Sequence, residues 1–201
     1  LGLQQTLDAI RSAGLEPLGA YGSKAEATRQ QGFILREIGG VRVALVAFTK
    51  GMDGMGLPAG SENSVNLLYT DYATTYRDIN REGIISILEN LKDEAPDITI
   101  AMLHWGSEFN DAISDTQGKI VELMQKNGVD VILGTHSHMV HELSYDDETG
   151  FFVAYSLGDF FGDGHRSGTN YSILLDLEIT KNNDTGETRV TDFGYTPLYI
   201  L

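Results

Sequence analysis

The middle of the sequence alternates twice between a helical and a strand pattern, and this alternation constrains the fold more than any other feature. Ile84, Leu88 and Leu91 recur at helical spacing on one face. We expect helices over 78–92 and 116–126 and strands over 97–103 and 129–133. Because each helix is followed by a strand, the strands are predicted to be parallel neighbours in an α/β sheet.

The segments on either side extend this prediction. The N-terminal part is expected to hold a helix over 3–12, a short helix capped by Ser23, and a hairpin of 33–38 and 41–48 around Gly39-Gly40. The strand patterns of the C-terminal part cover 141–145, 151–155, 171–179 and 189–195, and we expect them to form an antiparallel sheet. Residues 50–70 are Gly-rich and aperiodic and are predicted to be a long loop. One domain over residues 1–201 accommodates all of these elements.

Composition excludes several classes of partner and site. The chain carries 14 Lys and Arg against 29 Asp and Glu, a formal net charge of −15, which argues against nucleic acid or an anionic membrane surface as partner. It contains no Cys, so disulfides, thiolate zinc sites and a cysteine nucleophile are excluded. No apolar run approaches the roughly 20 residues of a membrane span. Any metal must therefore be held by His, Asp, Glu or Asn.

Histidines follow two of the predicted parallel strands. His104 comes directly after one strand, and His136 and His138 follow the other in the segment GTHSH. Ligands bind beyond the carboxyl ends of parallel strands, so these three side chains are predicted to meet at one edge of the sheet. Taken singly, each imidazole is better explained as a structural group, with His136 and His138 capping a strand end and His104 hydrogen-bonded in the core. Their joint placement favours a metal site with His104, His136 and His138 as ligands.

Two carboxylates are candidates for catalytic roles beside these histidines. Glu108 could orient a ligating imidazole or act as a general base, and the alternative is an exposed loop carboxylate. Asp159 could bond a metal-binding histidine or approach substrate, although turn chemistry alone would also explain it. Trp105 is expected to be buried behind the site rather than to form a substrate platform. His141 and His165 are assigned structural or solvent roles.

Three motifs in this order resemble a known family. The segments HWGSEF (104–109), GTHSH (134–138) and YSLGDFF (155–161) are similar to those of the CapA or PgsA family of bacterial capsule and poly-γ-glutamate synthesis proteins. The resemblance implies a calcineurin-like metallophosphoesterase fold, which is a two-sheet α/β sandwich flanked by helices. It also implies a two-metal centre of Mn, Fe or Zn, in which His104 and His136 serve one ion and His138 the other.

The sequence departs from the family pattern at its beginning. Family members carry an early strand with a metal-binding Asp, and an Asn-Asn-His motif, ahead of the helix that opens this sequence. We therefore expect residues 1–201 to be the larger, C-terminal part of such a domain, lacking its N-terminal strands and part of the metal ligand set. Smaller departures are Ser137 for the usual proline, Asp159 for asparagine and Phe109 for tyrosine.

The resemblance implies a capsule or poly-γ-glutamate biosynthesis protein with a metal-dependent phosphoesterase-like site. Its expected partners are a capsule polymer or phosphoester substrate and the capsule synthesis machinery. It would act outside the cytoplasm, at the cell surface or attached to the membrane through a preceding N-terminal segment. Two alternatives stay open. One is a non-catalytic assembly or anchoring module for an anionic capsule polymer, and the other is a metal-dependent phosphatase acting on small or wall-linked phosphoesters.

Overall fold

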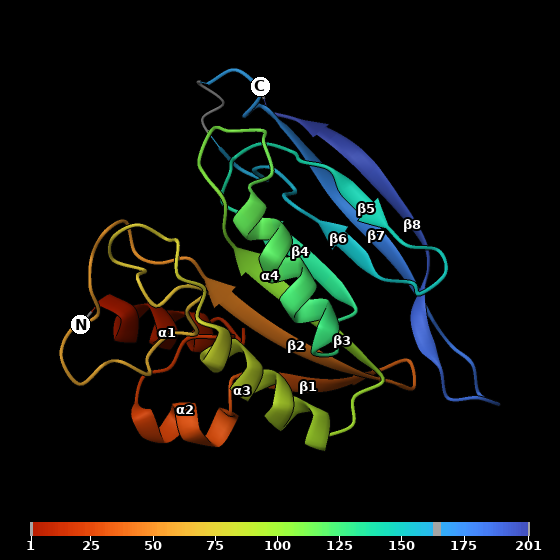
Figure 1. Cartoon of the computed structure of the whole chain (residues 1–201), viewed down its shortest axis with the longest axis horizontal. Helices are drawn as coiled ribbons and strands as arrows, with labels where there is room; N and C mark the ends of the chain where they lie inside the picture. The colour runs from red at the N-terminus through yellow and green to blue at the C-terminus, as the bar shows by residue number, and fades with distance from the viewer. Residues whose placement is uncertain (1, 163–165, 201) are drawn as a thin grey trace.

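A computed structural model describes residues 2–162 and 166–200 and contains helices, a large sheet and a small sheet (Figure 1). The helices are α1 (Gly2–Ser12), α2 (Lys24–Gln30), α3 (Arg81–Asp93) and α4 (Asp115–Lys126). The strands are β1 (Phe33–Ile38), β2 (Val41–Thr49), β3 (Ile98–His104), β4 (Val131–Thr135), β5 (Leu143–Tyr145), β6 (Phe152–Ala154), β7 (Tyr171–Lys181) and β8 (Thr188–Tyr199). Within this described part, no helix is both long enough and apolar enough to span a bilayer.

The large sheet has six strands in the order β1-β2-β3-β4-β6-β5. Strands β2, β3, β4 and β6 are parallel neighbours, while β1 and β5 run antiparallel at the two edges. The helix–strand alternation predicted for the middle of the chain is therefore confirmed. All four parallel strands point their carboxyl ends toward the same edge, and this edge positions the candidate site.

Local side-chain chemistry sets where the elements begin. Ser23, Asn80 and Ser114 each accept a hydrogen bond from a backbone N–H in the first turn of α2, α3 and α4. Helix α3 begins at Arg81 rather than at the predicted residue 78, because the carbonyl of Asp78 accepts the N–H of Thr70. The residues just before the helix are thus paired with the preceding loop.

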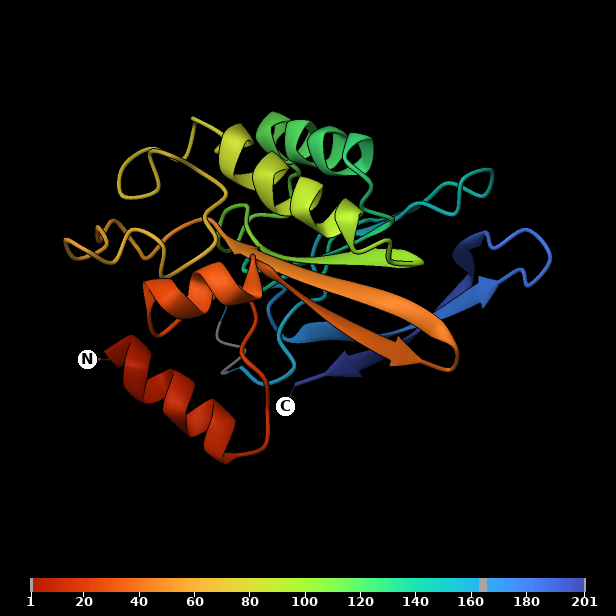
Figure 2. The same ribbon diagram turned by 90° about the horizontal axis from the view of Figure 1, so that it is seen from below.

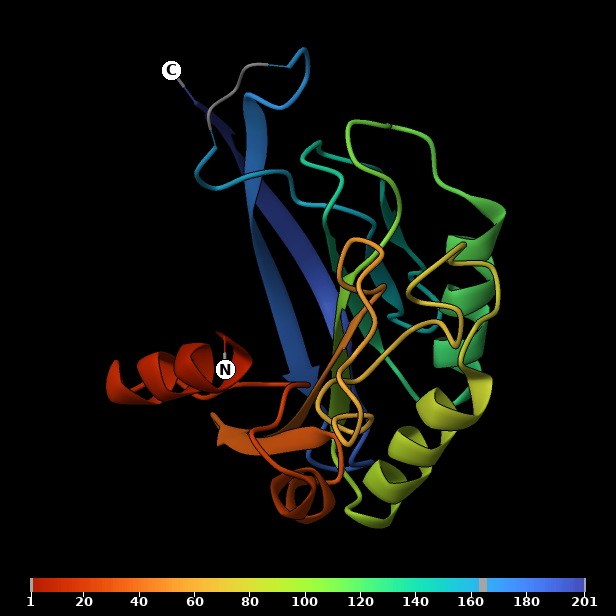
Figure 3. The ribbon, with the colours of Figure 1, turned by 90° about the vertical axis from the view of Figure 1, so that its left-hand side faces the viewer.

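The large sheet is covered on both faces (Figures 2 and 3). Helices α3 and α4 lie on one face, and the β7–β8 hairpin lies on the other. Alternation along β2 explains this: Ala44 and Val46 face the helices, while Val43 and its neighbour Leu45 face the β7–β8 side. The predicted two-sheet α/β architecture is confirmed.

The prediction of one antiparallel C-terminal sheet is wrong. Strand β6 joins the large sheet parallel to β4, and β5 pairs with β6 at its edge. All three residues of β6 are buried, as a strand covered on both faces requires. Strands β7 and β8 form a separate two-stranded antiparallel sheet.

Candidate functional site

Three neighbouring parallel strands end at the same level, and a polar side chain follows each. Thr49, the last residue of β2, pairs with His104 at the end of β3, which pairs with Thr135 at the end of β4. The chain beyond β2 stays against β3, because the N–H of Lys50 donates to the carbonyl of His104 at 2.8 Å. The sheet thus delivers Lys50, His104 and the segment that begins with His136 to one place.

The imidazoles of His104 and His136 lie against each other, with ring centres 4.3 Å apart. The ammonium of Lys50 reaches the same spot. Its Nζ donates to the carbonyl of Gly106 at 2.7 Å, lies 3.2 Å from Nε2 of His136, and sits 4.6 Å from the ring centre of Tyr76. An ammonium can only donate a hydrogen bond, so Nε2 of His136 accepts one from Lys50. The ring proton of the neutral His136 is then on Nδ1.

Burial and this ammonium keep the two imidazoles neutral. Burial lowers the pKa of His136 to about 4, and the neighbouring His104 ring and Lys50 ammonium, which disfavour a further positive charge, act in the same direction. Burial and then Lys50 lower the pKa of His104. Burial likewise lowers the pKa of Lys50. Both imidazoles are therefore neutral at neutral pH, the form that binds metals, and the Nε2 lone pair of His136 is occupied by the Lys50 ammonium.

A second part of the site is built around His138. Nδ1 of His138 lies 2.8 Å and 3.0 Å from the two carboxylate oxygens of Asp159, which follows the parallel strand β6. Asp159 therefore fixes the orientation of the ring and leaves Nε2 facing away from it. Oε1 of Glu108 lies 3.9 Å from that Nε2, on a side chain that is 49% exposed.

Aromatic and cationic side chains flank His138. The ring of Phe109 stacks on His138 with centres 5.0 Å apart and planes at 15°. The guanidinium of Arg166 lies 3.8 Å from the centre of the Phe109 ring. The stack brings a second cation toward the site, from a residue well beyond His138 in the sequence.

The loop that carries the histidines has an uncommon backbone conformation. His136 and His138 have φ values of 103° and 61°, a region that side-chain-bearing residues rarely adopt. Between them, the buried Ser137 donates its hydroxyl to the carbonyl of Met139 at 2.9 Å. Non-glycine residues held at positive φ concentrate at functional sites, where surrounding contacts impose the strain.

Trp105 and His141 are buried, and each side chain lies within hydrogen-bonding distance of a backbone carbonyl. Trp105 is buried, and its Nε1–H donates to the carbonyl of Tyr155 at 2.9 Å, so its predicted burial is confirmed. His141 is buried with Nε2 2.8 Å from the carbonyl of Asn110. His165 lies outside the described residues.

The donor chemistry of the site fits a divalent metal. Imidazole nitrogens beside carboxylates are ligands that Mn, Fe and Zn accept. Among residues 2–162 and 166–200, however, no group of three or more His, Asp or Glu side chains is gathered closely enough to hold an ion. The ring centres of His136 and His138 are 6.5 Å apart, and Lys50 lies against the lone pair of His136 that would bind a metal.

Sequence reasoning missed the two cations of the site. Lys50 directly follows the apolar strand β2, which lies parallel to β3. Its position after that strand could have predicted, from the sequence, that it lies near His104. Arg166 had no such signal, because it follows no parallel strand and reaches the site only through the ring of Phe109.

Comparison with known proteins identifies the family. The model of the family described as "Bacterial capsule synthesis protein PGA_cap" matches residues 1–163. The chain belongs to this family of bacterial capsule synthesis proteins. It is 29% identical over 190 residues to the PGA biosynthesis protein CapA of Bacillus subtilis (strain 168), covering 94% of this chain and 46% of that protein. It is 26% identical over 184 residues to the capsule biosynthesis protein CapA of Bacillus anthracis, covering 90% of this chain and 41% of that protein.

The chain therefore spans less than half the length of these curated relatives. Among solved structures, it is similar to the calcineurin-like phosphoesterase YfkN of Bacillus subtilis, with a TM-score of 0.43 and 18% identity over 83% of this chain and 50% of that one. A phosphatase from Mycoplasma pneumoniae gives a TM-score of 0.47 and 13% identity over 84% of this chain and 57% of that one.

Proposed function

We propose that this chain is part of a poly-γ-glutamate capsule synthesis protein and carries a metal-dependent phosphoesterase centre at the carboxyl edge of its large sheet. One observation supports this most: four neighbouring parallel strands, β2, β3, β4 and β6, deliver Lys50, His104, the His136–His138 segment and Asp159 to that edge. Membership of the capsule synthesis family supplies the biological setting.

His104, His136 and His138 are the proposed metal ligands. Bound divalent ions would polarise a phosphoryl group and lower the pKa of a bound water. Asp159 holds His138 by its Nδ1, so that Nε2 is presented in one orientation. Glu108 is the proposed proton acceptor for the attacking water, since its carboxylate lies next to His138 and is open to solvent.

Lys50 and Arg166 are proposed to hold the anionic substrate. The net charge of −15 repels a polyanion in general, and local cations are needed to offset this at the site. The Lys50 ammonium already interacts with a carbonyl and with His136, and Arg166 stacks on Phe109 beside His138. Both cations can donate to phosphoryl or carboxylate oxygens.

The described side chains do not gather a three-ligand metal site, so we propose that further ligands come from outside these residues. The curated relatives are more than twice as long as the matched part, which leaves room for such a segment. We further propose that the protein acts at the cell surface with other capsule synthesis components, held there by a segment outside this chain. Residues 1–201 would then be the C-terminal part of the metallophosphoesterase domain.

A non-catalytic assembly or anchoring module for the capsule polymer is the second candidate. The incomplete ligand set favours this second candidate, because the described His, Asp and Glu side chains form no complete metal site. In this case His138 and Asp159 would be a structural pair that fixes the loop. Binding of the polymer would then rest on surface side chains and would survive removal of metal.

Hydrolysis of bis(p-nitrophenyl) phosphate by the full-length protein, with Mn²⁺ supplied, separates the two candidates. The enzyme proposal predicts activity that His138→Ala abolishes and that chelator removes. Asp184→Asn is a control, because Asp184 lies in an exposed turn of the β7–β8 hairpin. If hydrolysis is absent and poly-γ-glutamate is still retained on the protein in chelator, the anchoring module is the correct function.

A further inference from the structure

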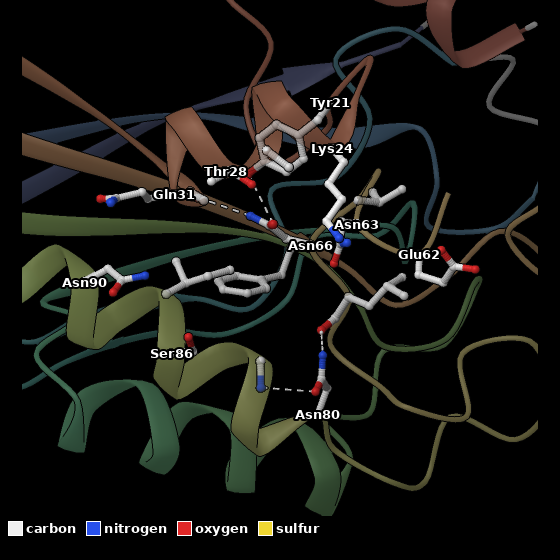
Figure 4. A pocket seen from close by; sticks show the side chains of 17 residues that line it. Tyr21, Lys24, Thr28, Gln31, Glu62, Asn63, Asn66, Asn80, Ser86 and Asn90 are labelled. Carbon is white, nitrogen blue, oxygen red and sulfur yellow. Dashed lines mark hydrogen bonds between the residues drawn. The ribbon is translucent and has the colours of Figure 1, made fainter. Parts of the chain in front are cut away.

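A cavity of about 580 Å³ lies between α2, α3 and the segment 62–67 (Figure 4). Its volume falls within the roughly 300–1,000 Å³ of small-molecule sites. None of its lining residues belongs to the histidine site described above. The cavity is therefore a separate candidate for ligand binding.

The floor of the cavity is apolar and held in place by amide hydrogen bonds. Phe48, from the helix-facing side of β2, is 3% exposed and forms part of the lining. Beside it the buried Asn66 donates from Nδ2 to the carbonyls of Gly32 and Ala47, both at 3.1 Å, and accepts the hydroxyl of Tyr21 at 3.2 Å. Every group of this amide is engaged, so Asn66 fixes the floor rather than offering hydrogen bonds to a ligand.

The rim of the cavity carries hydrogen-bonding side chains that the protein leaves unused. Helical spacing places Ser86 and Asn90 on one face of α3, and Thr28 and Gln31 at the end of α2 face them across the opening. Asn63 completes the rim. The hydrogen bonds found among residues 2–162 and 166–200 engage none of these five side chains, and all five are exposed.

The charges at the cavity cancel. Lys24 and Glu62 are the only lysine and carboxylate among the lining residues, and none is an arginine. An anionic ligand would need an excess of positive charge that the lining does not supply. The rim offers amides and hydroxyls, each of which can donate and accept.

We propose that this cavity binds a neutral saccharide of one or two rings. Neighbouring sugar hydroxyls both donate and accept, and they match the alternating donors and acceptors of Thr28, Gln31, Asn63, Ser86 and Asn90. The apolar C–H face of a sugar ring would lie toward the floor formed by Phe48 and the aliphatic residues Val65, Leu67 and Ile87. This ligand class differs from the phosphoester proposed for the histidine site.

Saturation-transfer NMR of the full-length protein with glucose, galactose, N-acetylglucosamine and maltose tests the proposal. We expect at least one of these sugars to bind, and we expect Asn90→Leu to weaken it by about tenfold, which corresponds to about 1.4 kcal/mol for the lost hydrogen bonds. Gln125→Leu is the matched control, because Gln125 is an exposed amide on α4 away from the cavity and its substitution should leave affinity unchanged.

Two results would overturn the proposal. Absence of signal from all four sugars at millimolar concentration would show that the cavity is not a saccharide site. Sugar binding that Asn90→Leu and Asn63→Leu both leave intact would place the site elsewhere on the protein. Glucuronate and glutamate are included as anionic probes, and tighter binding of either than of every neutral sugar would show that the inferred ligand class is wrong.

Discussion

Substituting Gly134 by alanine tests how closely the strand that carries the histidines is packed. A Cβ at Gly134 would lie 2.1 Å from the carbonyl oxygen of Tyr155 and 2.4 Å from Nε1 of Trp105. Both distances are far below van der Waals contact. Because the carbonyl oxygen of Tyr155 belongs to the backbone and cannot rotate away, the strand itself must shift. The shift would also disturb the 2.9 Å hydrogen bond from Trp105 to Tyr155.

The expected cost follows from these two effects. Overpacking costs about 1–3 kcal/mol and a disrupted buried hydrogen bond about 1 kcal/mol, so Gly134→Ala should lower the free energy of unfolding by about 2–4 kcal/mol. At about 2–4 °C per kcal/mol for a chain of this size, Tm should fall by about 4–16 °C. Trp105 is the only tryptophan, so urea and thermal unfolding followed by its fluorescence report on this region.

Gly118→Ala provides the matched control. Gly118 lies within α4, and a Cβ there would meet nothing within 4 Å. The substitution should stabilise the protein by about 0.5–1 kcal/mol, because alanine is the better helix former. If Gly134→Ala leaves the free energy of unfolding within about 0.5 kcal/mol of the wild type, the close packing derived for β4 and Trp105 is wrong.

Three further predictions concern charge and packing. Lys50→Met should raise the pKa of His136 from about 4 toward its usual value, because a neighbouring positive charge is removed. An NMR titration of His136 that shows no rise would contradict the contact between Lys50 and His136. Hydrogen bonds from the Arg42 N–H and from Lys181 lower the pKa of Asp97 in the folded protein. The ionised Asp97 therefore stabilises the folded state above its unfolded pKa of about 3.9, and this stabilisation is lost as pH falls through the lower folded value. Asp97→Asn should therefore be less stable than the wild type at pH 7, with the difference shrinking in acid, and a difference independent of pH would refute this. Leu88→Ala, buried between α3 and the sheet, should cost about 2–5 kcal/mol in urea unfolding, and a cost below 1 kcal/mol would contradict that packing.

The parts of the fold that the sequence predicts are those with local signals. Ser23 marks the start of α2 by its side-chain oxygen, and Gly39-Gly40 marks the hairpin because both residues adopt positive φ, at 60° and 82°. The pairing of β5 and β6 with the large sheet had no local signal. Their three-residue lengths are too short to display a period, and only contact with β4 decides which sheet they join.

The candidate site was predictable to the same extent. His104 and His136 follow strands whose parallel order is readable from the sequence, and the structure places their rings 4.3 Å apart. The contact between Lys50 and His136 depends on the rotamers of two side chains 86 positions apart, which no sequence pattern specifies. The stack of Arg166 on Phe109 is likewise a tertiary contact.

The metal content of the protein produced from its complete gene decides whether the histidines are ligands. It is measured by elemental analysis after purification without chelator. We predict about two divalent ions per chain, the number that a two-metal centre requires. His138→Ala should lose about one of them, and its unfolding curve checks that the variant is folded. No bound metal, or the same metal content in His138→Ala as in the wild type, would contradict the assignment of the histidines as ligands.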